Sequence, residues 1–182
     1  STLSVHAGAR PDPVTGARGT PIYQTTSFVF DDAEHGAELF NLQTFGYVYS
    51  RMTNPTVSVF EERVAQLEGG RGAVATSSGH AAQFIAAATL MEAGDEFIAS
   101  RNLYGGSVTQ FGVSFPKLGW KCNFVDPTDP ENFEKAMNDK VKFIFCEGVA
   151  NPGGIILDLE KIADIAHKLS LIHISEPTRR AI

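Results

Sequence analysis

The stretch of this sequence best suited to chemistry is the turn Ser77-Ser78-Gly79. An apolar run of strand character at 72–76 precedes the turn, and strong helix formers follow it from His80. A strand that breaks at such a turn and continues as a helix gathers free backbone N–H groups at the positive end of the helix dipole. Phosphate is a common ligand of that arrangement. A capped helix with a glycine turn is the alternative interpretation of this stretch alone.

Two more polar groups follow apolar runs further along the chain. Tyr104 comes after the run at 96–99, and Asn151 ends a polar stretch that follows the run at 141–146. Ligands of parallel sheets bind beyond the carboxyl ends of the strands, so we expect both residues to lie beside the Ser-Ser-Gly turn. Taken singly, a tyrosine at a strand end and an asparagine in a turn are the simpler interpretations.

The elements that would position these residues alternate along the chain. Strands are expected at 72–76, 96–99, 120–124 and 141–146, and helices at 60–67, 79–91, 108–115, 131–137 and 159–166. Near-continuous apolar strands that alternate with helices predict an α/β fold, in which a parallel sheet carries helices on both faces. The helix over 79–91 is apolar almost all round, so we expect it to be buried.

Residues 1–51 differ from the rest of the chain. Glycine and proline recur there, and no periodic apolar segment is long enough to build a separate core. The many aromatic side chains of this segment argue against disorder. We therefore expect a loop-rich N-terminal arm that docks on a neighbouring subunit, followed by one large domain at 52–169.

The alternation of strands and helices is not continued after Lys168. A buried strand is expected next, but the segment has no glycine stop and carries Pro177. Residues 170–182 resemble a translated sequencing-library adapter, so we expect a non-native tail without a functional role. A natural divergent tail is the alternative.

The composition of the chain favours some classes of protein and argues against others. Of 182 residues, 43% are hydrophobic and 20% charged, which is typical of a soluble globular protein. The net charge of -6 and the absence of a basic cluster in the body of the chain argue against nucleic acid as a partner. No apolar stretch is long enough to cross a membrane. Cys122 and Cys146 lie in apolar runs without metal-ligand spacing, so we expect core thiols in the cytoplasm and no metal site.

Five runs of the sequence together resemble the Cys/Met-metabolism family of pyridoxal-phosphate (PLP) enzymes. The runs cover 20–25, 49–56, 76–84, 103–106 and 147–152. The most specific is Tyr-Ser-Arg-x-x-Asn-Pro-Thr at 49–56. The resemblance implies the large domain of a fold-type I PLP-dependent transferase, truncated, with PLP as cofactor and a homo-oligomer that is a dimer of dimers.

The resemblance also implies which residues hold the cofactor phosphate. Tyr49 and Arg51 would reach the phosphate of a neighbouring subunit, where a planar guanidinium suits phosphate oxygens. Ser78, Gly79 and the backbone N–H of His80 would hold the same phosphate within their own subunit. A surface cation is the simpler interpretation of Arg51, and a packing or solvent-facing ring is that of His80.

Two residues are expected at the cofactor ring. Tyr104 would stack on the ring and assist proton transfers, so that it and Tyr49 are the expected catalytic side chains. Asn151 would hydrogen-bond the phenolic oxygen of the cofactor. Gly148 departs from the Ser or Thr that many members of this family carry at the corresponding position.

The implied reaction of the full-length enzyme is a γ-replacement, in which O-acetylhomoserine and sulfide give homocysteine. Cystathionine γ-synthase, cystathionine γ-lyase and methionine γ-lyase activities are alternatives within the family. No lysine of this chain stands in the context of the family's Schiff-base lysine, so we expect a truncated and inactive piece. A non-catalytic module that binds a phosphate or nucleotide is the alternative from another class, although both common nucleotide-loop motifs are absent.

Overall fold

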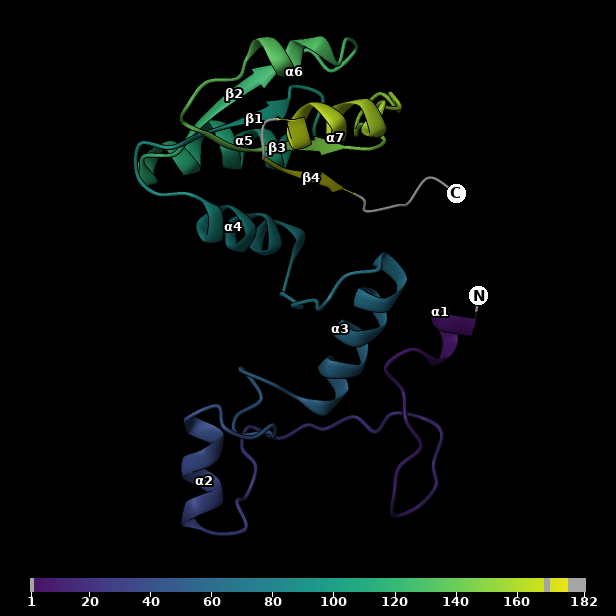
Figure 1. Ribbon diagram of the computed structural model, residues 1–182. Coiled ribbons are helices and arrows are strands. Elements are labelled where there is room, and N and C mark those ends of the chain that lie inside the picture. The colour runs from purple at the N-terminus through teal and green to yellow at the C-terminus, as the bar shows by residue number, and fades with distance from the viewer. Residues whose placement is uncertain (1, 169–170, 177–182) are drawn as a thin grey trace. The chain divides into compact units, whose positions relative to one another are not determined.

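The computed structural model describes residues 2–168 and 171–176 of the chain (Figure 1). It divides into two compact units, residues 1–75 and residues 76–182, which are described separately below.

The second unit is built on a parallel sheet of the described strands. These strands are β1 (Glu96–Ser100), β2 (Lys121–Val125), β3 (Val141–Glu147) and β4 (Ile172–Glu176), and their spatial order is β2-β1-β3-β4. Ala99 of β1 lies opposite Phe124 on one side and Phe145 on the other. The predicted parallel sheet is confirmed.

Helices cover both faces of this sheet (Figure 1). One face packs on α4 (Gly79–Leu90) and on a helical run made of α5 (Gly105–Thr109), the π-helix η1 (Gln110–Ser114) and the 3-10 helix η2 (Phe115–Leu118). The other face packs on α6 (Glu131–Lys135) and α7 (Leu159–Lys168). Alternate residues of each strand supply the two cores, because successive side chains of a strand point to opposite faces.

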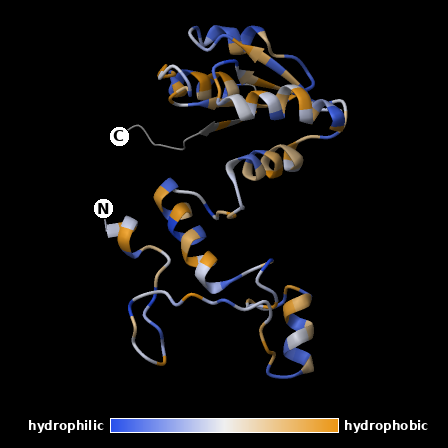
Figure 2. Cartoon of the chain, turned by 180° about the vertical axis from the view of Figure 1, so that it is seen from behind, coloured by the Kyte–Doolittle hydropathy of each residue, from blue (hydrophilic) through white to orange (hydrophobic). Residues whose placement is uncertain are grey.

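Two expectations about the residues near the boundary between the units are wrong. Residues 72–76 belong to no strand. Helix α4 is exposed along much of its length: Phe84 and Ile85 are 42% and 48% exposed, and Ala87 is its buried residue. Figure 2 shows the predominantly apolar colouring of α4. The helix has the composition of a buried element, but the described residues of its unit cover only the side that carries Ala87.

The expectation that the sheet ends after β3 is also wrong. Strand β4 pairs with β3 in parallel register, so that Ile172 lies opposite Phe143 and Ile174 opposite Phe145. Ile172 and Ile174 are β-branched, and residues of this type are enriched in strands. Residues 169–170 and 177–182 of the predicted tail lie outside the described residues. The non-native origin of the tail stays a prediction.

The first unit contains three helices among its described residues, α1 (Thr2–His6), α2 (Ala33–Phe40) and α3 (Pro55–Glu68). The sequence predicts α3, which begins at the cap Asn54 and ends at Gly69 in the left-handed conformation. It predicts neither α1 nor α2. Arg63 of α3 donates a hydrogen bond to the carbonyl of Ala7 at 2.9 Å, so α3 belongs with the arm rather than with the sheet.

Few apolar side chains of this first unit are buried. They are Ala7, Leu39 and Ala65 among the residues described. Two large apolar side chains of the arm, Val29 and Phe45, are almost fully exposed. In the part of the chain that the structure describes, no helix is long and apolar enough to cross a membrane.

Candidate functional site

The carboxyl edge of the sheet carries a pocket of about 410 Å³. Its lining residues come from the first turns of α4, from the start of α5 and from the loop after β3. They are Gly79, His80, Gln83, Tyr104, Ser107, Glu147, Val149 and Asn151. The structure therefore brings four of the predicted site residues to one pocket: Gly79, His80, Tyr104 and Asn151.

The amino end of α4 forms one wall of the pocket. Ser78 is the extended cap residue of this helix, and its hydroxyl oxygen accepts a hydrogen bond from the N–H of Ala81 at 3.2 Å. The N–H of Ala82 is bonded to the carbonyl of Ser78 at 3.0 Å. Within the described residues the backbone N–H groups of Gly79 and His80 have no acceptor. Two free donors thus lie at the positive end of a helix dipole, as an anion site requires.

Ser78 caps the helix next to the pocket. Its hydroxyl oxygen caps α4, and Ser78 is not one of the residues that line the pocket. Its hydroxyl still has one proton to donate, because a capping oxygen uses only its acceptor capacity. A direct bond from Ser78 to a phosphate stays a prediction.

The rings of Tyr104 and His80 lie next to each other at the mouth of the pocket. Their centres are 5.9 Å apart and their planes are tilted by 37°. Gly106 lies beneath both rings: a Cβ at this position would come within 2.5 Å of Cε1 of Tyr104 and 2.6 Å of Cε1 of His80. Only glycine leaves enough space there for the two rings. Tyr104 is 51% exposed, so its phenol is open to a ligand.

Glu147, the last residue of β3, joins two parts of the pocket. Its Oε1 accepts a hydrogen bond from the backbone N–H of Tyr104 at 2.8 Å, and its Oε2 accepts one from the backbone N–H of Asn151 at 3.1 Å. The residue is only 5% exposed. The sequence gives Glu147 no role, although a carboxylate at the end of an apolar strand is a signal that could have been used.

Two amides support the helices around the pocket, and the sequence analysis missed both. Gln83 donates a hydrogen bond to the buried hydroxyl of Ser107 at 3.0 Å, which ties α4 to α5. Gln110 donates one to the carbonyl of His80 at 2.9 Å and so ties the π-helix to the first turn of α4. These bonds hold the amino end of α4 against the α5 run.

The two remaining predicted residues, Tyr49 and Arg51, lie in the first unit. The guanidinium carbon of Arg51 is 5.4 Å from the centre of the Tyr49 ring, within cation–π distance. Tyr49 is 40% exposed and pairs with Ser27 through an isolated antiparallel bridge. Both side chains are therefore presented at the surface of a fixed turn.

A group of hydrogen bonds fixes this turn. Asn54 donates from Nδ2 to the carbonyl of Tyr23 at 3.0 Å and to the hydroxyl of Ser50 at 2.9 Å. Its Oδ1 accepts from the N–H of Thr56 at 2.9 Å. The hydroxyl of Thr56 accepts from the N–H of Tyr23 and donates to the carbonyl of Pro21, both at 2.9 Å. Two runs that are distant in the sequence, 20–25 and 49–56, are thereby joined.

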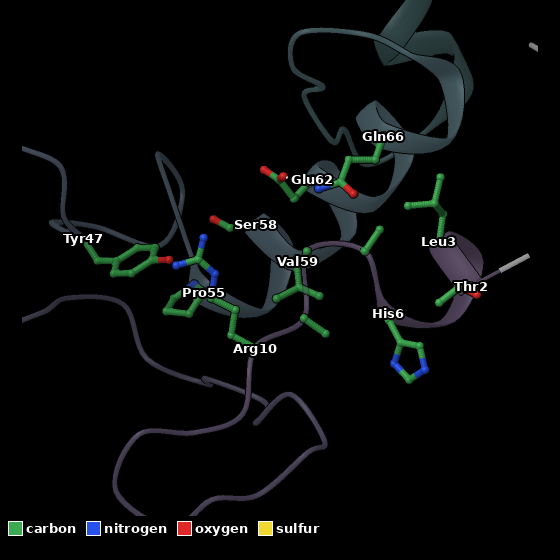
Figure 3. Close-up of a pocket in the computed structure, with 13 residues that line it drawn as sticks. Thr2, Leu3, His6, Arg10, Tyr47, Pro55, Ser58, Val59, Glu62 and Gln66 are labelled. Atoms are coloured by element: carbon green, nitrogen blue, oxygen red, sulfur yellow. Dashed lines mark hydrogen bonds between the residues drawn. The ribbon is translucent and has the colours of Figure 1, made fainter.

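A second cavity, of about 510 Å³, lies between α1 and α3 in the first unit (Figure 3). Leu3 and His6 of α1 line it together with Val59 and Glu62 of α3. It contains none of the predicted site residues, and we assign no function to it.

The two cysteines are free thiols of the sheet. Burial raises the pKa of Cys122, and burial together with the neighbouring charge of Glu147 raises the pKa of Cys146 to about 12. Neither thiol is therefore a nucleophile at neutral pH. Among the described residues there is no group of three or more His, Cys, Asp or Glu side chains that could hold a metal ion.

Comparison with solved structures extends this description. The chain superposes with a TM-score of 0.92 on a structure from Campylobacter jejuni subsp. jejuni NCTC 11168 that is assigned as an O-acetylhomoserine (thiol)-lyase. The two sequences are 36% identical, and the match covers 97% of this chain and 43% of the other. That structure carries N'-pyridoxyl-lysine-5'-monophosphate at position 205 of its own numbering. The fold is thus that of a PLP-dependent enzyme.

Sequence comparison identifies the family. The sequence model of the Cys/Met metabolism PLP-dependent enzymes matches residues 1–178, and the chain belongs to this family. It is 48% identical over 170 residues to the O-acetyl-L-homoserine sulfhydrylase of Leptospira meyeri, and 47% identical over 166 residues to the homocysteine synthase of Schizosaccharomyces pombe. The matches cover 93% and 91% of this chain but only 38% and 39% of those proteins.

Proposed function

We propose that this chain is part of an enzyme that makes homocysteine from O-acetylhomoserine and sulfide, with PLP as cofactor. The observation that carries the proposal is the pocket in which Tyr104 and Asn151 meet the free N–H groups at the start of α4. The family and the names of the relatives support the choice of reaction.

The described residues fit the cofactor in three respects. A dianionic phosphate needs several donors, and the N–H groups of Gly79 and His80 are unsatisfied at a helix amino end. An aromatic ring needs a flat apolar surface, and Tyr104 offers its half-exposed ring at the same pocket. The amide of Asn151 lies on the wall of this pocket as well and provides a donor for an oxygen on the ring.

Bound PLP supplies an electron sink that stabilises negative charge on the substrate. The N–H groups of Gly79 and His80 would bind the phosphate. Tyr104 would pack against the ring, and its phenolic oxygen would hold or transfer a proton. Asn151 would donate a hydrogen bond to an oxygen on the ring.

Tyr49 and Arg51 complete the phosphate site in this proposal, and they do so from a neighbouring subunit of a dimer of dimers. Their position at an exposed turn, in a unit with few buried apolar side chains, supports docking on another chain. An amino-acid substrate and sulfide are the small-molecule partners. Free cysteines are consistent with the cytoplasm as the compartment.

The test needs a chain of full length. We define the grafted enzyme as the Leptospira meyeri sulfhydrylase in which residues 1–168 of this chain replace the matching part. The proposal expects the grafted enzyme to take up PLP, to give a borohydride-stable pyridoxyl adduct, and to form homocysteine from O-acetylhomoserine and sulfide. The unmodified Leptospira enzyme is the positive control.

Other outcomes would contradict the proposal. A folded grafted enzyme that binds ATP or NAD in place of PLP would favour the nucleotide-binding alternative. Preference for O-succinylhomoserine, cystathionine or methionine over O-acetylhomoserine would leave the family role intact but overturn the proposed substrate.

A further inference from the structure

Glu147 is a buried carboxylate whose two oxygens have separate partners. Oε1 lies 2.8 Å from the backbone nitrogen of Tyr104, and Oε2 lies 3.1 Å from the backbone nitrogen of Asn151. Both partners donate, so the side chain acts only as an acceptor, as an ionised carboxylate does. No ion pair to Glu147 is found among the described residues. The two hydrogen bonds from backbone N–H groups therefore offset the energetic cost of burying this side chain.

Among the described residues, no other side-chain hydrogen bond joins the two loops that Glu147 connects. Tyr104 precedes α5, and no side chain caps this helix. The acceptor of the backbone N–H of Tyr104 is the carboxylate of Glu147. The loop that carries Asn151 closes on itself, because the N–H of Ala150 bonds to the carbonyl of Ile155 at 2.8 Å and that of Gly154 bonds to the carbonyl of Ala150 at 2.9 Å. Glu147 is the hydrogen-bonding side chain that spans from one loop to the other.

We propose that Glu147 is a positioning residue that sets the spacing of Tyr104 and Asn151 across the pocket. It lines the pocket but acts through the two backbone groups it accepts from. The inference rests on the proposed function, because Tyr104 and Asn151 matter only if both contact the same cofactor. Small errors in the placement of such groups reduce turnover more than binding, since the reacting geometry is stricter than the bound geometry.

The test substitutes Glu147→Gln. An amide has one acceptor oxygen and one donor nitrogen, so it can hold one of the two N–H groups but not both. In the cofactor-free grafted enzyme, we expect hydrogen exchange at the backbone amide of Tyr104 or Asn151 to rise at least about tenfold, while exchange at Phe145 in β3 is unchanged. In the loaded enzyme we expect kcat to fall by about 10- to 100-fold, with KM within about threefold.

Glu96→Gln is the matched control. Glu96 begins β1 and therefore lies at the opposite edge of the same sheet, where it accepts hydrogen bonds from Asn123 and Lys121. The same chemical change there is expected to leave exchange at Tyr104 and Asn151, and also kcat, unchanged. If Glu147→Gln does not fold, Glu147→Asp serves in its place, because it keeps a carboxylate but is one methylene too short to reach both loops.

The outcomes separate this inference from the proposed function. Unchanged exchange at both amides in the folded Glu147 variant overturns the positioning role, whether or not the enzyme makes homocysteine. Faster exchange with unchanged kcat also overturns the positioning role, because the loops would then move more freely without any effect on turnover. An unsubstituted grafted enzyme that makes no homocysteine contradicts the proposed function, and the exchange measurement still decides whether Glu147 joins the loops.

Discussion

The guanidinium group of Arg51 lies over the ring of Tyr49, with its central carbon 5.4 Å from the ring centre. The contact holds the flexible Arg51 side chain in one region, at the surface of a turn fixed by Asn54. An arginine ordered in this way is suited to meet phosphate oxygens of another subunit with little further loss of side-chain entropy.

We predict that Arg51→Ala in the grafted enzyme weakens PLP retention by about 1.5–3 kcal/mol, the range for a hydrogen bond to a charged group. Equilibrium dialysis against PLP measures the change. Mixed oligomers test whether the site is shared: Arg51→Ala chains are combined with chains that lack the Schiff-base lysine. If each site combines residues of two chains, a dimer of one chain of each kind has one site with both lesions and one site with neither. Activity is then recovered at the intact site. Mixed oligomers of confirmed composition without activity would contradict sharing.

Local sequence patterns predicted the sheet because a short apolar run bounded by turn residues indicates a strand. Strands β1 and β3 are of this kind, whereas β2 was predicted from the alternation of Trp120, Cys122 and Phe124. The exposure of α4 could not be predicted, since the composition of a helix states what it can bury but not which segments are there to cover it. Helix α2 was missed because it is short and contains Gly36.

The candidate site was predictable in part. Gly79, Tyr104 and Asn151 were found because each follows a strand or opens a helix, and parallel strands bring these positions to one edge. His80 was proposed only from the family resemblance. The role of Glu147 depends on a bond to a backbone group 43 residues away in the sequence, and that bond exists only in the observed register of β1 and β3. No local pattern contains this information.

Tyr104→Phe is predicted to keep PLP and lose turnover. The stacking face survives, but the phenolic oxygen that holds a proton does not, and general acid–base groups typically contribute about 10²–10⁴ to kcat. PLP content and kcat of the grafted enzyme provide the measurement. Tyr47→Phe is the matched control, because Tyr47 lies outside the 410 Å³ pocket. Turnover unchanged in Tyr104→Phe would reduce this residue to a packing role.

Gly106→Ala is predicted to damage the site without damaging the fold. The added methyl group would meet Cε1 of Tyr104 at 2.5 Å and Cε1 of His80 at 2.6 Å, so at least one ring has to move. We expect kcat/KM of the grafted enzyme to fall by about 10- to 100-fold. Gly105→Ala is the control, because a Cβ there meets no atom within 4 Å. Equal activity of the two variants would show that the rings adapt freely.

The stability of the sheet is predicted to depend on pH through Glu96. Hydrogen bonds from Asn123, Asn138 and Lys121 lower the pKa of Glu96 from 4.5 to about 2 in the folded protein. Its contribution to the free energy of unfolding is therefore complete above the unfolded pKa of 4.5 and is lost as the pH falls towards 2. Thermal midpoints of the grafted enzyme and its Glu96→Gln variant should differ most at pH 6–7, above the unfolded pKa of Glu96, and should converge only near pH 2, at its folded pKa. A constant difference across this range would assign the effect to packing.

The 182-residue chain itself is predicted to bind PLP weakly and to form no covalent adduct. No lysine lines the pocket of the described structure, so the remaining contacts are the N–H groups at α4, one aromatic face and the amide of Asn151. The exposed apolar side chains of α4, Phe84 and Ile85 among them, also predict poor solubility. The chain is purified, incubated with PLP, treated with borohydride and digested for mass spectrometry. A stable pyridoxyl group on one particular lysine would contradict the prediction, because that lysine would then provide the covalent anchor that we expect only in the full-length enzyme.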